Sequence, residues 1–170
     1  ATIYFVKDAS EKIAICHLPD IVEDEEFISI NTKYNRFSFS KKNGSTPLLI
    51  SPLGCERSIP LHPVVHDPQG NKLQARIVRQ KLLVHGGVRC IVSQSGSFSS
   101  RSGKDVMDFS LFYHIYPQRP FISIDFTIHN PRAARHWGGM WDLGDPGSIY
   151  FSDCSLTAEL PDIPSELSWQ

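Results

Sequence analysis

Two neighbouring runs decide the fold, Met107–Ile115 (MDFSLFYHI) and Ile122–His129 (ISIDFTIH). In each run apolar side chains alternate with more polar ones, most regularly in the second, and Pro117–Pro120 lies between the two runs. Successive side chains of a β-strand point to opposite faces, so alternation over this length indicates half-buried strands. The sequence therefore predicts an antiparallel hairpin with one apolar face.

Shorter runs with the same pattern surround this hairpin. The strands expected from them are the runs around Ile28–Ile30, Phe37–Phe39, Leu48–Ile50, Leu73–Leu83, Val88–Val92 and Ile149–Leu156. No stretch keeps a helical period over the length of a helix. Many short strands with closely spaced turn signals are typical of an all-β, antiparallel β-sandwich, supersandwich-like and with few or no helices. We expect residues 1–170 to form one such domain.

Three segments are expected to lie outside the strands. The acidic run Ile21–Glu26 reads as a solvated connection. Residues 51–72 are expected to be irregular because their prolines cannot donate to a sheet ladder. The serine- and glycine-rich segment Ser93–Lys104 is predicted to be a turn or mobile loop.

The composition excludes some classes of partner. A net charge of −1 argues against a nucleic acid bound through bulk electrostatics. No apolar run reaches the ~18 residues of a membrane span, and we expect no membrane partner. The start has no signal-peptide pattern and no initiator Met, which suggests a fragment of a larger multidomain protein. A secreted or periplasmic location is favoured.

The cysteines and histidines give weak site signals. Cys16, Cys55, Cys90 and Cys154 contain no Cys-x-x-Cys pair, so free thiols are expected, with at least one disulfide as the alternative. His62 and His66 have the spacing of a helical metal site, but Pro63 between them argues against a helix. We expect no metal site and no cofactor.

The segment His129–Ser148 is the only dense cluster of chemically useful side chains. The candidate ligand-binding residues in it are Arg132, Arg135, His136, Trp137, Trp141, Asp142 and Asp145. Indole rings offer flat apolar faces to sugar C–H groups, and carboxylates accept hydrogen bonds from hydroxyls. Arginine can hold a uronate carboxylate through two hydrogen bonds. These residue types together predict contact with an oligo- or polysaccharide.

Two other interpretations of this segment stay open. Its tryptophans can cap the core of a sandwich, while its arginines and aspartates pair and hold the loop in shape. Asp142 and Asp145 can also help to bind Ca²⁺, although two carboxylates alone are thin support. The polar residues His114, Asp125 and His129 are expected on the other face of the hairpin, as a site or simply as solvated side chains.

Residues 75–156 resemble part of a known enzyme family. The similarity is carried by Val88–Val92, by Met107–Tyr113, by Pro120–Pro131, and above all by the stretch from His-Asn-Pro to Gly-Gly-Met-Trp-Asp-Leu-Gly-Asp-Pro-Gly-Ser at 129–148. These runs resemble the amino-terminal β-rich region of the exo-rhamnogalacturonan lyases. The resemblance implies a β-sandwich, a sugar context, and a catalytic domain of the same chain that is not in this sequence, since family members also contain an α/α toroid.

The resemblance would make the whole protein a polysaccharide lyase acting on a uronate-containing pectic polymer. Such a lyase needs a base for the proton alpha to the carboxylate, and a group that neutralises that carboxylate. His129 or His136 as the base and Arg132 or Arg135 as the neutralising group are possible in principle, but we expect no complete catalytic site within a lone sandwich.

We therefore expect a module for substrate contact or domain packing. The alternative is a free-standing carbohydrate-binding or structural interaction module without enzymatic activity. A sugar epimerase-like sandwich is a third interpretation, and it would need an acid and a base paired across the sheet, which the sequence does not locate.

Overall fold

The chain folds into two antiparallel sheets. The computed structural model describes residues 18–41, 48–132 and 147–160, and these contain ten strands and no helix. The strands are β1 (Asp20–Glu23), β2 (Phe27–Asn31), β3 (Asn35–Ser40), β4 (Leu48–Pro52), β5 (Ile59–His66), β6 (Gln74–Val84), β7 (Cys90–Ser99), β8 (Asp105–Ile115), β9 (Ile122–His129) and β10 (Asp153–Ala158). The predicted all-β antiparallel sandwich is thus confirmed.

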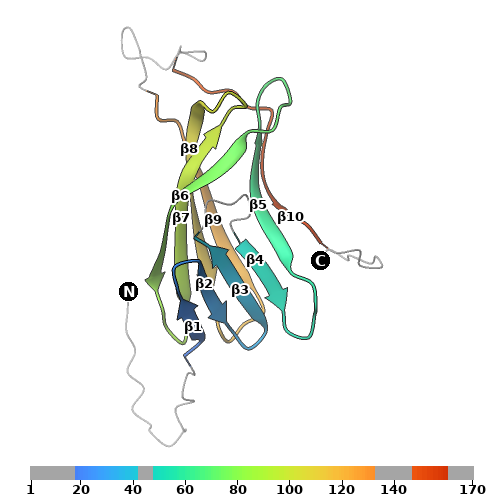
Figure 1. The fold of residues 1–170 in the computed structure, drawn as a ribbon, viewed down its shortest axis with the longest axis vertical. Helices are drawn as coiled ribbons and strands as arrows, with labels where there is room; N and C mark the ends of the chain where they lie inside the picture. The colour runs from blue at the N-terminus through green and yellow to red at the C-terminus, as the bar shows by residue number, and fades with distance from the viewer. Residues whose placement is uncertain (1–17, 42–47, 133–146, 161–170) are drawn as a thin grey trace, which may run out of the picture.

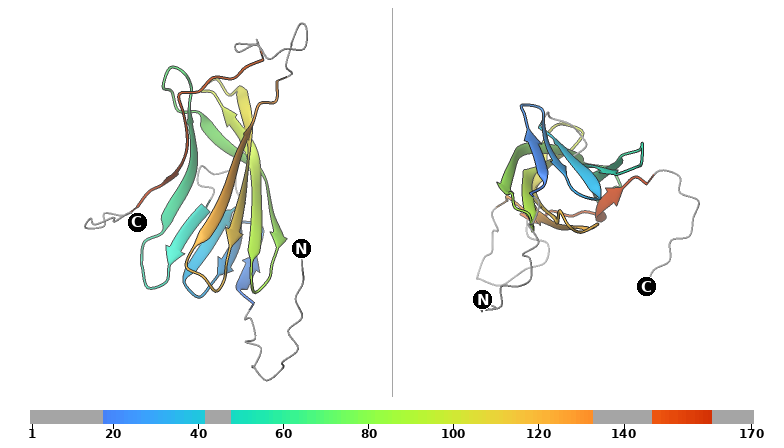
Figure 2. Two further views of the ribbon diagram at one scale, coloured as in Figure 1. Left: turned by 180° about the vertical axis from the view of Figure 1, so that it is seen from behind. Right: turned by 90° about the horizontal axis from the view of Figure 1, so that it is seen from below.

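The sheets pack face to face around one hydrophobic core. One sheet has the order β1-β2-β3-β4-β5-β10 and the other the order β6-β7-β8-β9 (Figure 1). The view from below in Figure 2 shows the two sheets wrapped around the space between them. That space is filled by side chains of both sheets, among them Ile28, Phe39, Leu111 and Tyr113, each with none of its surface exposed.

The predicted hairpin is present as β8 and β9. Leu111 lies opposite Phe126 and Tyr113 lies opposite Ile124. The apolar residues of β8 are buried, whereas those of β9 are only partly buried against the core. The polar residues His114, Asp125 and His129 lie on the other face, as the alternation predicted.

The expectation of a loop at Ser93–Lys104 is wrong. β7 continues to Ser99, and the structure confines the turn to residues 100–104. Phe98 is fully buried, and Gln94 is buried with 1% of its surface exposed. Serines take the alternate positions: Ser93 and Ser95 are half-buried, whereas Ser97 and Ser99 are buried and donate to Asp105. A strand of the sandwich thus has the composition of a loop.

Residues 51–72 are also more regular than expected. β5 contains Pro60 and Pro63, and it pairs with β4 at Ile59–Leu61 and with β10 along Leu61–His66. The free energy gained by burying Leu61, Val64 and Val65 exceeds the loss of the backbone hydrogen bonds that the two prolines cannot donate. The acidic segment Ile21–Glu26 likewise includes part of the edge strand β1, and the last strand begins at Asp153 rather than at Ile149.

A chain of hydrogen bonds crosses the core between the sheets. The Tyr113 hydroxyl donates to Gln94 Oε1 at 2.9 Å, and Gln94 Nε2 donates to Gln80 Oε1 at 2.5 Å. Gln80 Nε2 then reaches the carbonyl oxygen of Phe39 in the opposite sheet at 3.3 Å. Burial raises the pKa of the Tyr113 hydroxyl, so it stays protonated and remains a donor.

Candidate functional site

The two ends of the segment predicted to carry the site are tied together. The Asn130 side chain donates to the carbonyl oxygen of Gly147 at 2.8 Å, and Arg132 Nη1 donates to that of Ser148 at 3.3 Å. The backbone N–H of Arg132 also donates to Asn130 Oδ1 at 2.9 Å. The chain therefore leaves β9 and returns toward β10 at one place, the upper end of the molecule in Figure 1.

Arg132 is the one predicted ligand-binding residue that the structure describes. It is exposed, and its guanidinium binds a backbone carbonyl, so part of its role is to close the loop. The other predicted residues lie outside the described residues: Arg135, His136, Trp137, Trp141, Asp142 and Asp145.

A hollow of about 150 Å³ lies at the foot of this segment. It is lined by Met107, Ile128, His129, Asn130, Ile149 and Phe151. Met107 is buried, whereas Phe151 has 44% of its surface exposed. We call these six residues the loop foot. It combines an accessible aromatic ring with amide and imidazole groups, the mixture that recognises a sugar ring through stacking and hydrogen bonds.

The aromatic pair Tyr150 and Phe151 was missed as a site signal. Tyr150 has 61% of its surface exposed, and both residues directly follow the loop. The sequence predicts a strand at Ile149–Leu156, and within a strand an aromatic residue is ordinary. The structure keeps them outside β10, so their side chains remain accessible.

The outward polar residues of the β8–β9 hairpin form two separate pairs. His114 Nε2 lies 3.0 Å from Asp125 Oδ2, while His129 Nδ1 lies 4.0 Å from Asp108 Oδ2. Asp108 and His114 are six positions apart on β8, which is roughly 20 Å along a strand. The pairs therefore do not combine into one acid and base, and only His129 lines the loop foot.

His62 and His66 do not face a shared metal. They lie on the strand β5, where residues four positions apart are separated by roughly 13 Å. Each contacts its own acid: His62 Nε2 lies 3.6 Å from Glu159, and His66 Nδ1 lies 3.3 Å from Asp153. The described residues contain no group of three or more histidine, cysteine or acidic side chains placed to hold a metal ion.

The described cysteines are free thiols. Cys55 is exposed, Cys90 is buried and Cys154 is half-buried. Burial raises the pKa of the Cys90 and Cys154 thiols, and the nearby Asp153 carboxylate adds to the effect at Cys154. Since the thiolate is the reactive form, these two thiols are poor nucleophiles. Cys16 lies outside the described residues.

No family model matches the chain, and no curated protein matches it. Across residues 18–41, 48–132 and 147–160, no helix is long and apolar enough to cross a bilayer.

Proposed function

We propose that the chain is a carbohydrate-associated β-sandwich module, which contacts an oligo- or polysaccharide at the loop foot and through the segment 133–146. The observation that carries the proposal is the accessible ring of Phe151 beside Asn130 and His129, where the two ends of the loop meet. The residue types of the loop, with Trp137 and Trp141 among them, support the same ligand class.

The proposed role is substrate contact rather than complete catalysis. The loop foot contains one imidazole, and the nearest described carboxylate, that of Asp108, lies 4.0 Å from it. A lyase that acts on a uronate also needs a cation to neutralise the carboxylate. Arg132, the described arginine at the loop, uses its guanidinium on the carbonyl of Ser148. The resemblance to exo-rhamnogalacturonan lyases then suggests a catalytic domain of the same protein as the natural neighbour.

The binding part is tested by titration with pectic oligosaccharides, followed by calorimetry and tryptophan fluorescence. A saturable response is expected, and Phe151→Ala should raise Kd about five-fold, since stacking on an aromatic ring is worth on the order of 1 kcal/mol. Trp137→Ala and Trp141→Ala test the loop itself. The matched control is Phe121→Ala, because Phe121 is 55% exposed and lies at the opposite end of β9.

Two results would contradict the proposal. Absence of any response in the wild-type protein removes the binding claim and leaves a module for structural interaction or domain packing. Release of unsaturated product from pectic polymer by this chain alone, seen as ultraviolet absorption, shows that the sandwich does complete catalysis.

A further inference from the structure

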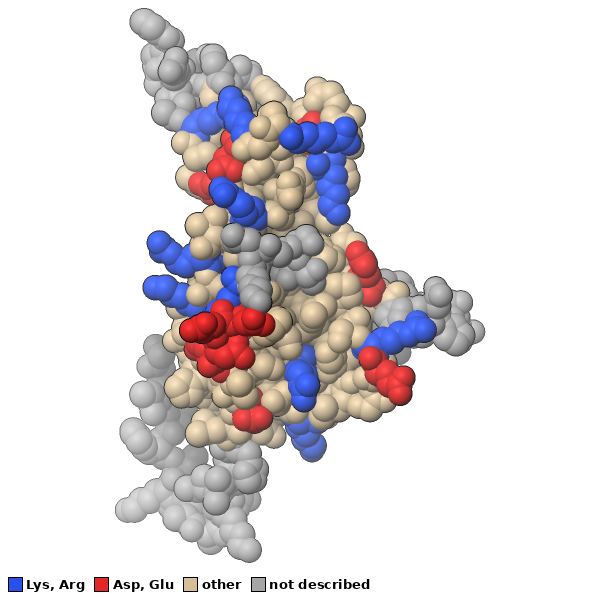
Figure 3. All heavy atoms as spheres, in the orientation of Figure 1, with Lys and Arg blue, Asp and Glu red and all other residues tan. Residues whose placement is uncertain are grey.

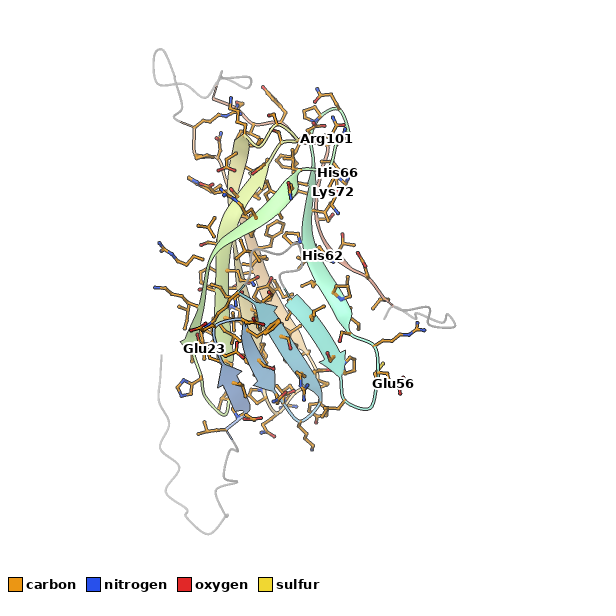
Figure 4. All side chains as sticks on the ribbon, in the orientation of Figure 1. Glu23, Glu56, His62, His66, Lys72 and Arg101 are labelled. Carbon is orange, nitrogen blue, oxygen red and sulfur yellow. The ribbon has the colours of Figure 1, made fainter. Side chains whose placement is uncertain are left out.

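A second groove shares no residue with the loop foot. It runs along β5 from near mid-height, at His62, to the upper end of the molecule, at Lys72 and Arg101 (Figure 4). Its first part, about 330 Å³, lies between β5 and the start of β6 and is lined by His62, Pro63, Ala75 and Glu159 among others. Its second part, about 250 Å³, reaches the β7–β8 turn. Lys72 and Leu73 line both parts, so the two hollows adjoin. We call them together the β5–β6 groove.

Two cations face the second part of the groove. Lys72 and Arg101 both line it, and Figure 4 shows them close together beside His66 at the upper end of β5. Neither has an ion-pair partner within 4 Å among the residues that the structure describes. Figure 3 shows Lys and Arg side chains gathered over this part of the surface. Of the acids that the structure describes, only Asp67 lines this part of the groove with them, and Arg101 acts on its carboxylate electrostatically, so the two cations face a single carboxylate.

Two of the described acids line the groove, Asp67 in the second part and Glu159 in the first. Asp67 accepts hydrogen bonds from the backbone of Gln69 and Asn71 and from the Asn71 amide, on both carboxylate oxygens. These bonds hold the pKa of Asp67 below its usual value, with a smaller effect of Arg101. Glu159 lies in the first part of the groove, beside His62. The second part therefore holds two cations against one carboxylate, and this excess of positive charge favours an anion there over the first part, which holds Glu159.

The turns that present these side chains are held firmly. In the β7–β8 turn the N–H of Gly103 donates to the Ser100 carbonyl at 2.9 Å, and Gly103 adopts a φ of 79° that a side chain disfavours. In the β5–β6 turn the N–H of Gly70 donates to the Asp67 carbonyl at 2.9 Å. A ligand therefore meets a groove whose backbone is already ordered, which lowers the entropy lost on binding.

The rest of the lining suits a hydroxylated ligand. Ser100, Ser102 and Asn71 line the cationic end. The two serine hydroxyls lie 2.9 Å apart and the Asn71 Nδ2 donates to Asp67, so these residues offer a ligand their hydroxyl oxygens and the Asn71 Oδ1 as acceptors. Leu73, with 5% of its surface exposed, forms an apolar floor beneath them. The first part alone has the volume of a small-molecule site, for which about 300–1,000 Å³ is typical. We infer that the β5–β6 groove binds a small polyhydroxylated acid, with its oxyanion between Lys72 and Arg101, its apolar face against Leu73 and its hydroxyls toward Ser100, Ser102 and Asn71.

The test is a two-dimensional amide NMR titration at low salt with four probes: galacturonate, a hexose phosphate, inorganic phosphate and neutral galactose. Galacturonate, the hexose phosphate or both should cause saturable shifts at Asn71, Lys72 and Ser100–Ser102, and galactose should not. The acid with the lower Kd shows whether the groove prefers a carboxylate or a phosphate. Lys72→Gln with Arg101→Gln should raise Kd about ten-fold or more, since hydrogen bonds to charged groups are worth roughly 1.5–3 kcal/mol.

The control variant removes the same charge from another surface. Arg79→Gln with Lys81→Gln changes two exposed cations of β6 outside the groove, and it should leave Kd unchanged. An equal loss in the control would show that net charge alone attracts the acid, and it would overturn the inference. Binding of inorganic phosphate as tight as that of both hydroxylated acids, or no saturable shift at all, would also overturn it. Shifts at His129 and Asn130 report the loop foot separately, so the two proposals can fail independently.

Discussion

Gly96 is the position where the smallest substitution should disturb the fold most. It lies on β7 opposite Ile77, next to the irregularity in pairing between Ile77 and Arg79. A Cβ atom at Gly96 would lie 2.9 Å from the carbonyl carbon of Arg76 and 3.0 Å from the Cα of Ile77, and closer still to the Arg76 oxygen. These are backbone atoms of a paired strand, which cannot rotate away as a side chain could.

Gly96→Ala should therefore destabilise the protein by moving β6 away from β7. Overpacking of this kind costs about 1–3 kcal/mol. The alanine also lowers the conformational entropy of the unfolded chain, and this offsets about 0.4–1 kcal/mol of the loss in stability. We expect a net loss of about 1–2 kcal/mol in the free energy of unfolding. With a urea m-value of about 1–3 kcal/mol/M, the midpoint followed by circular dichroism should fall by roughly 1 M.

Gly86→Ala is the matched control. Gly86 lies outside the strands, and a Cβ atom there would meet only the carbonyl oxygen of Arg89, at an ordinary distance of 3.4 Å. The same glycine-to-alanine change should leave stability unchanged or raise it by up to about 1 kcal/mol. Equal midpoints for the two variants, or an unchanged midpoint for Gly96→Ala, would refute the argument from close backbone approach.

Two further predictions concern buried and charged hydrogen bonds. Tyr113→Phe removes the fully buried hydroxyl that donates to Gln94. It should lower the free energy of unfolding, measured in urea, by about 1–3 kcal/mol. An unchanged midpoint would show that the buried hydrogen bonds add no stability. Hydrogen bonds from Ser99 and Ser97 lower the pKa of Asp105, and Arg76 has a smaller effect in the same direction. The ionised carboxylate therefore stabilises the fold at a pH above its unfolded-state pKa of about 3.9. This stabilisation is lost as the pH falls through the lower pKa of the folded state. Asp105→Asn should thus be less stable than the wild type at pH 7, with the difference shrinking in unfolding curves below about pH 4, and a difference independent of pH would contradict the assignment.

The strands with regular alternation could be predicted from the sequence, and the reason is visible in the core. Residues of one parity on β8, from Met107 to Ile115, are all buried against the opposite sheet. The short runs around Ile28–Ile30 and Phe37–Phe39 follow the same rule and pair with each other as β2 and β3. Where one face of a strand is buried and the other meets water, the alternation of apolar and polar residues is sufficient to predict the strand.

The part of β7 after Val92, which the sequence did not predict as a strand, has its evidence in tertiary contacts. Along β7 the inward positions hold Gln94 and Gly96, which look polar or flexible in isolation. Gln94 is nevertheless suited to the core because Tyr113 and Gln80 satisfy its side chain. Gly96 is suited to it because β6 approaches too closely for any side chain. Both reasons depend on residues distant in the sequence, so no local pattern can reveal them.

The candidate site could likewise be predicted only in part from the local sequence, and the rest of it depends on tertiary contacts. The residue types of 129–148 pointed to one loop, and the structure ties the ends of that loop together through Asn130 and Arg132. Nothing in the local sequence connects this loop with Met107, which forms the floor of the loop foot, or connects Lys72 with Arg101 across the β5–β6 groove. Those groups meet only because antiparallel pairing returns the chain to the same end of the sheets.

The antiparallel pairing of the strands also explains why both proposed binding regions reach the same end of the molecule. The register places Gln74 beside Ser99, Asp108 beside His129, and His66 beside Asp153, so the connections after β5, β7 and β9 all leave from the upper end in Figure 1. The Ser152 hydroxyl joins two of these connections by donating to the carbonyl of Asp67 at 2.8 Å. A ligand long enough to reach from the loop foot to the β5–β6 groove would contact both regions at once. Its affinity should then exceed that of either fragment, because the second contact is made at a high effective concentration.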